Sequence, residues 1–147
     1  MLVFSQILGL RVNPADLLGA TRRYFDAELE VLGEAQAPGA HALHLRLTAP
    51  SHTGEFIVRA RHATREDLER ARQAEINGRA AGMASLAERC PTIWVIEERA
   101  PRSDAALFNL CAILASVALG PVLPDDSSTL FGVRGALERV AKSRKIH

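Results

Sequence analysis

The sequence predicts an α+β fold: a mixed sheet of five or six strands that contains an antiparallel meander, with helices packed mainly on one face. Three observations support it. Three segments between residues 27 and 62 alternate apolar and polar side chains, the period of half-buried strands. A long helical pattern follows them. The continuous apolar run from Ile93 to Ile96 is then typical of a strand covered on both faces.

The length and composition indicate one globular domain, residues 1–147. Apolar residues make up 48% of the chain and charged residues 24%, so the chain can bury a core without metals or disulfides. The formal net charge of +1 provides no overall field for nucleic acid or an anionic membrane, and we expect neither as a partner. Cys90 and Cys111 lie in apolar stretches, which predicts buried thiols and a cytoplasmic location.

The first elements are a strand and a helix. Leu2 to Leu10 predicts a strand, although a helix fits this short apolar run nearly as well. Asn13 and Pro14 predict a helix start, because Asn caps helices and Pro suits the first helical position. We expect this helix to run to about Phe25. Its apolar side would hold Leu17, Leu18, Tyr24 and Phe25.

The meander consists of the segments AELEVL, HALHLRLTA and EFIVRARH. We expect turns at Ala37-Pro38-Gly39 and at Pro50 to Gly54 between them. The alternation directs one set of side chains to the core, and one face of the meander stays wet. The inward set comprises Leu29, Val31, Leu43, Leu45, Leu47, Phe56, Val58 and Ala60.

A long helix is predicted from Thr64 to about Arg89, opened by a capping box in which Asp67 is the fourth residue. Gly78 and Gly82 would each cost about 1 kcal/mol inside this helix, so we expect close packing of the backbone to offset that cost. If the strands on either side of the helix run parallel in one sheet, they form a right-handed crossover. The apolar stripe of the helix would hold Leu68, Ile76, Ala80, Met83 and Ala87.

Ser103 predicts the start of an apolar helix that ends near Leu119, before Gly120-Pro121. The apolar run is too interrupted for a membrane span, so we expect this helix to lie buried against the sheet and the long helix. A polar loop, PVLPDDSS, follows it. Residues Thr129 to Val133 predict a short strand before a last helix, and one continuous helix is the alternative.

No residue pattern predicts a catalytic centre, a cofactor or a metal site. His41 and His44, which are three apart in a strand, would point to opposite faces. The candidate partner-binding residues are four cationic or near-cationic groups on one sheet face, and two aspartates in the polar loop. They are His44, Arg46, Arg59, Arg61, Asp125 and Asp126. Cross-strand pairing of the cations with Glu28 and Glu30, and simple capping by the aspartates, are the alternatives.

The order of helical and strand patterns in the second half of the chain resembles that of a known group of proteins. The segments DLERARQAEINGRAAGMASLAERCPTIWVIEE, ALFNLCAILASVALGP and STLFGV follow one another between Gly54 and Val133. In this order they resemble small bacterial α/β domains of unknown function, some of which are similar to immunity and accessory proteins encoded beside secreted toxins. The resemblance implies binding rather than catalysis, and it carries no site residues across.

Together these observations predict a non-catalytic domain that binds another protein, such as a toxin or effector, as an immunity or accessory factor. A small enzyme or ligand-binding domain is the alternative, with a pocket at the His/Arg-rich sheet face. Self-assembly through the apolar helix is a third interpretation, so a homo-oligomer stays open.

Overall fold

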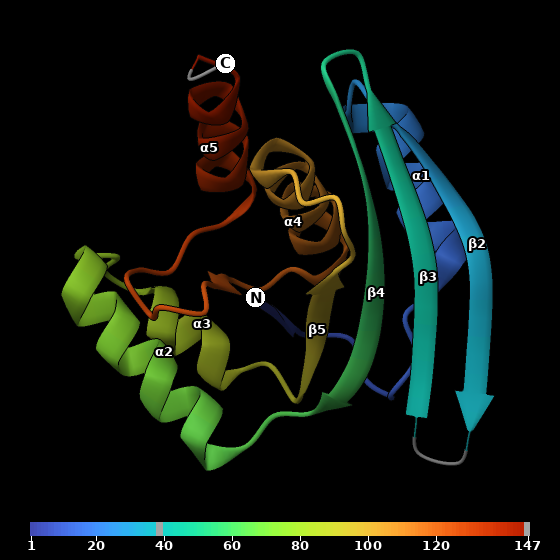
Figure 1. Ribbon diagram of the computed structural model, residues 1–147. Helices are drawn as coiled ribbons and strands as arrows, with labels where there is room; N and C mark the ends of the chain where they lie inside the picture. The colour runs from blue at the N-terminus through green and yellow to red at the C-terminus, as the bar shows by residue number, and fades with distance from the viewer. Residues whose placement is uncertain (38–39, 146–147) are drawn as a thin grey trace.

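The computed structural model describes residues 1–37 and 40–145 (Figure 1). Strands and helices follow the predicted order closely. The strands are β1 (Leu2–Ser5), β2 (Glu28–Ala37), β3 (Ala40–Ala49), β4 (His52–His62), β5 (Thr92–Glu98) and β6 (Val122–Leu123). The helices are α1 (Pro14–Tyr24), α2 (Arg65–Gly78), α3 (Met83–Glu88), α4 (Asp104–Ala118) and α5 (Val133–Lys145).

The six strands form one sheet in the order β2-β3-β4-β5-β1-β6, which confirms the α+β class and the meander. Its strand pairs are all antiparallel, so the sheet is not mixed. The inward residues of β3 and β4 predicted from the alternation are buried. The turn between β3 and β4 is only Pro50 and Ser51, and Pro38-Gly39 lies outside the described residues.

The conditional parallel crossover between β4 and β5 is wrong, because β5 pairs with β4 antiparallel, with His62 opposite Thr92. A single helix from Arg65 to Arg89 would have carried the chain about 38 Å, to the far end of the sheet. The chain instead returns to the end of the sheet at which β4 finishes, and β5 begins there. The Ala63 amide donates to the Pro91 carbonyl at 3.0 Å and closes this excursion.

The return requires the predicted long helix to break, and it divides into α2 and α3. Arg79 ends α2 at a φ of 52°, and Gly82 begins α3 at a φ of 87°. Gly82 is therefore explained by its positive φ and not by close packing, since a Cβ there would meet nothing within 4 Å. Gly78 does mark a close approach, because a Cβ would lie 2.0 Å from Thr129 Oγ1. The expected close packing at Gly78 is therefore made against the loop that holds Thr129.

Helices cover the two faces of the sheet unequally (Figure 1). α1 and α4 pack on one face, where Leu17 and Leu110 meet Leu45 and Phe56 in the larger core, and α5 packs on α4. α2 and α3 cover only the β5-β1-β6 part of the other face, around Phe4. Over the remaining β2-β3-β4 part of that face, the described residues place no helix.

The apolar helix α4 lies inside the chain's own core, as its composition predicted. Its principal helical neighbours are α5 and α1, and not the long helix, which lies on the opposite face of the sheet. Within the described residues, none of the helices has both the length and the apolar character needed to cross a membrane.

Four other local predictions are wrong. Tyr24 is 74% exposed and Ile76 is 69% exposed, although both were assigned to apolar helix faces. The segment from Thr129 to Val133 makes a single bridge, Phe131 to Val122, before α5 starts at Val133. The partner strand β6 falls within the stretch that was predicted to be a polar loop.

Candidate functional site

The part of the sheet without a described helix, with Glu97 of the adjoining β5, presents a row of mostly charged side chains, here called the open face. It alternates with the buried residues of the same strands, so the pleat of β2, β3, β4 and β5 places its members together. The open face consists of Glu28, Glu30, His44, Arg46, Glu55, Ile57, Arg59 and Glu97.

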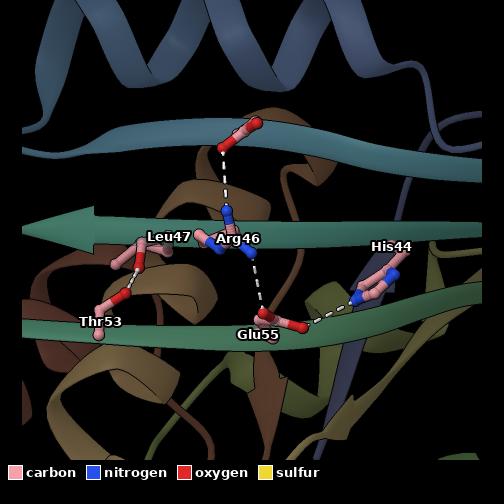
Figure 2. Close-up of polar contacts among 6 residues, drawn as sticks. His44, Arg46, Leu47, Thr53 and Glu55 are labelled. Carbon is pink, nitrogen blue, oxygen red and sulfur yellow. Dashed lines mark hydrogen bonds and ion pairs between the residues drawn. The ribbon is translucent and has the colours of Figure 1, made fainter.

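The centre of the open face is a chain of ion pairs across three strands (Figure 2). Arg46 on β3 donates to Glu55 at 3.1 Å and reaches Glu30 on β2 at 3.5 Å. His44 Nε2 lies 3.1 Å from the other oxygen of Glu55. These pairs confirm cross-strand pairing with Glu30, and they show that Glu55 holds the two predicted cations together.

The same contacts keep Glu55 ionised. Hydrogen bonds from Arg46, and then from His44, hold the pKa of the Glu55 carboxyl below its usual value of 4.5. A general base or acid works best when its pKa is close to the working pH. The arrangement is therefore suited to fixed charge recognition and poorly suited to proton transfer at neutral pH.

Carboxylates outnumber guanidinium groups on the open face. Arg59 lies 3.6 Å from Glu97, in an exposed pair. The carboxylates are Glu28, Glu30, Glu55 and Glu97, and the guanidinium groups are Arg46 and Arg59. Four negative and two positive charges leave a net charge of −2 with a neutral His44 and −1 with a protonated His44. The surface that appeared basic in the sequence is thus acidic when its strands are aligned.

Arg61 lies on the same sheet face but is occupied by a structural contact. Its guanidinium group donates two hydrogen bonds to Asp67, at 2.6 and 2.9 Å. Asp67 also accepts from the Thr64 amide at 2.8 Å, which completes the capping box predicted at the start of α2. Arg61 therefore fastens β4 to α2, and it is a poor choice for a partner-binding residue.

The structure places Asp125 and Asp126 away from the open face, in a loop attached to α2. Asp125 pairs with the amino group of Met1, and Arg70 of α2 donates to the Asp125 carbonyl at 3.4 Å. Hydrogen bonds from the Ser128 hydroxyl and amide hold the pKa of Asp126 below its usual value. Asp126 thus has the local capping role that the sequence left as the alternative, whereas Asp125 makes a long-range ion pair with the chain's amino group, which the sequence did not predict.

His41 and His44 point to opposite faces, as predicted. His41 is 5% exposed; its Nδ1 accepts from the Val12 amide at 3.1 Å and its Nε2 lies 2.7 Å from Glu34. Because Nδ1 accepts, the proton of the neutral ring is on Nε2, directed at Glu34. His41 is therefore an interior anchor for the segment before α1.

Among the described residues, no three His, Cys, Asp or Glu side chains are grouped to hold a metal ion. Two concavities border α1, and apart from Glu28 none of the residues that line them belongs to the open face. One, of about 330 Å³, is lined by Leu18, Thr21, Arg22, Ala27, Glu28 and Leu29. The other, of about 190 Å³, is lined by Tyr24, Phe25, Asp26, Asn109, Leu137, Val140 and Ala141.

Sequence reasoning missed Glu55 and Glu97 as members of the site. Glu55 could have been found, because it shares the strand parity of Arg59 and Arg61. Glu97 could not, since its place beside Arg59 depends on β5 pairing antiparallel with β4. Asp67 was recognised as a cap, but nothing in the local sequence shows that it binds Arg61.

Comparisons with protein-family models, with curated proteins and with solved structures give no match for this chain.

Proposed function

We propose that the protein acts by binding another protein at the open face, without carrying out a reaction. One observation carries the proposal: β2, β3 and β4, together with Glu97 of the adjoining β5, present a fixed, net acidic row of charges on the part of the sheet face that no described helix covers. Complementary potentials steer association and select partners. The partner surface is therefore basic, and the acidic row disfavours nucleic acid.

The geometry of the charges supports recognition over catalysis. The Glu55 carboxylate is held ionised by Arg46 and His44, and its pKa is shifted away from neutrality. Each cation on the open face is already engaged by a carboxylate of the same sheet. The resemblance to immunity and accessory proteins suggests a toxin or effector as the partner. A cytoplasmic location belongs to the same proposal.

Charge reversal on the open face tests the proposal. Wild-type protein and a Glu30→Lys/Glu97→Lys variant are immobilised and exposed to host-cell extract at low and high salt. A Glu69→Lys/Glu138→Lys variant is the matched control, because these glutamates are exposed on α2 and α5, away from the open face. We expect wild type and control to retain a basic protein that salt releases, and the open-face variant to lose it.

Two results would contradict the proposal. Equal retention by all three proteins would show that the open face is not the binding surface. Hydrolysis of a nucleotide or an ester by the purified protein, lost on changing His44 or Arg59, would favour the enzyme alternative. Arg61 is left unchanged in these variants, since it fastens α2 to the sheet.

A further inference from the structure

The outer edge of the open face is the strand β2, which has ten residues and ends the sheet. No other described strand pairs with it on the side away from β3. An edge of this kind carries a row of backbone N–H and C=O groups that can accept a further strand. Because Glu28 and Glu30 belong to β2, the edge and the acidic row adjoin each other.

The hydrogen-bond alternation identifies the outward groups. Ala49 and His52 flank a two-residue turn and so form a hydrogen-bonded pair. The neighbouring residue Thr48 then bonds toward β2, where it is paired with Glu28. It follows that the backbone groups of Leu29 and Val31 point outward. On the opposite side of β4, the Arg99 amide donates to the Glu55 carbonyl at 2.9 Å, as this alternation requires.

A groove accompanies this edge. In the view of Figure 2, α1 runs alongside β2 on the side away from β3. The concavity of about 330 Å³ lies between them, and its lining includes Leu18 and Arg22 from α1 and Glu28 and Leu29 from β2. This volume is at the lower end of the roughly 300–1,000 Å³ that ligand pockets occupy. A helix beside an open strand edge is a geometry that accommodates an extended peptide.

We propose that an extended segment of the partner adds as a strand to β2 along Glu28–Val31. Its apolar side chains enter the groove beside Leu18 and Leu29. Its alternate side chains, on the other face of the new strand, are basic and lie beside Glu28 and Glu30. The inference rests on the proposed function, and it specifies the docking edge and the partner's pattern: basic and apolar residues in alternation.

Two features of β2 select this occupant. If two copies of the chain paired antiparallel about Leu29, Glu28 of each would stand opposite Glu30 of the other, and like charges in this position are destabilising. The register shift between Val31 and Gly33 ends the regular part of the edge. The matching segment is therefore short and cationic, and a second copy of this chain is a poor fit.

Three synthetic peptides test the inference. The first, Thr-Lys-Val-Lys-Val-Lys-Thr, alternates basic and apolar residues. The second replaces each lysine with glutamate, and the third, Lys-Lys-Lys-Val-Val-Thr-Thr, keeps the composition and removes the alternation. Binding is measured by titration calorimetry, and amide hydrogen exchange is followed by NMR. Variants Glu28→Lys and Glu69→Lys carry the same charge change on β2 and on α2.

We expect the first peptide to bind most tightly and to slow exchange of the Leu29 and Val31 amides. Glu28→Lys should weaken this binding about tenfold, because a cross-strand attraction becomes a repulsion. Glu69→Lys should leave it unchanged. Equal binding of the first and third peptides, protection elsewhere on the chain, or no binding would overturn the inference. So would protection of Leu29 that increases with protein concentration in the absence of peptide, because a second copy would then occupy the edge.

The two proposals fail separately. Capture of a basic partner through the open face, without protection of β2 by the peptide, would leave the proposed function standing and remove the added strand. Peptide addition to β2, with capture of the partner unchanged in the Glu30→Lys/Glu97→Lys variant, would leave the added strand standing and remove the proposed function.

Discussion

Replacement of Asp67 with alanine should destabilise the protein by about 2 kcal/mol, because Asp67 performs two separate tasks. Loss of a capping side chain costs about 1 kcal/mol. The charge-assisted bonds to Arg61 would be worth about 1.5–3 kcal/mol if they were fully buried. The Asp67 side chain is 6% exposed, but that of Arg61 is 40% exposed, so water replaces part of this contribution and about 1 kcal/mol remains.

The change can be measured by urea unfolding, followed by circular dichroism, at neutral pH. For a domain of this size the same loss lowers Tm by about 4–8 °C. Glu97→Ala is the control, because Glu97 is 58% exposed and has one contact at 3.6 Å to Arg59. A surface pair of this kind contributes at most about 1 kcal/mol and often nothing measurable.

The dependence on pH provides a second check. Burial, the largest single influence, raises the pKa of Asp67, but hydrogen bonds from Arg61 and Thr64 outweigh it and hold the pKa below 3.8. The ionised carboxylate therefore adds stability above pH 3.8, and that stability is lost as the pH falls through the folded-state pKa. The difference between wild type and Asp67→Ala should shrink in this acid range. A difference below about 0.5 kcal/mol at neutral pH, or one that does not change with acid, would refute the two assigned roles.

The other predictions concern glycines and thiols. Gly78→Ala should destabilise by more than about 1 kcal/mol, because the new Cβ would lie 2.7 Å from the Thr129 Cα. Gly19→Ala should instead stabilise the protein by about 0.5–1 kcal/mol, because Gly19 lies in the middle of α1 and a Cβ there would meet nothing within 4 Å. Chemical unfolding of both variants tests these predictions, and a stabilised Gly78→Ala or a destabilised Gly19→Ala would contradict them. Burial raises the pKa of the Cys90 thiol to about 11 and that of Cys111 to about 12. Alkylation by iodoacetamide at pH 8 should therefore be at least about 100-fold slower in the folded protein than in urea, and mass spectrometry that finds rapid labelling of either thiol would contradict this.

The strands of the meander were predictable because their information is local. Alternation along β3 and β4 fixes which residues are buried, whatever the strands pair with, and it placed Leu45 and Phe56 in the core correctly. Caps are local as well, since Asn13, Thr64 and Ser103 each bond a backbone amide two or three residues away. The same reasoning failed for α2 and α3, where strong helical periodicity concealed a reversal at Arg79 and Gly82.

The sign of the net charge on the open face depended on information that no single strand contains. Each strand segment shows its own charges, and Arg46, Arg59 and Arg61 dominate two of them. Strand parity within β4 already places Glu55 on the side of Arg59, but only the strand pairing brings Glu30 and Glu55 together around Arg46, and only the antiparallel return of β5 brings Glu97 beside Arg59.

The sequence by itself determined the fold class, the buried face of the meander and the starts of the capped helices, because side-chain period and capping act over a few residues. The tertiary structure alone decided the direction of β5, the acidic character of the open face and the groove between α1 and the edge of β2. These depend on contacts between residues far apart in the chain, and the break between α2 and α3 determines at which end of the sheet β5 begins.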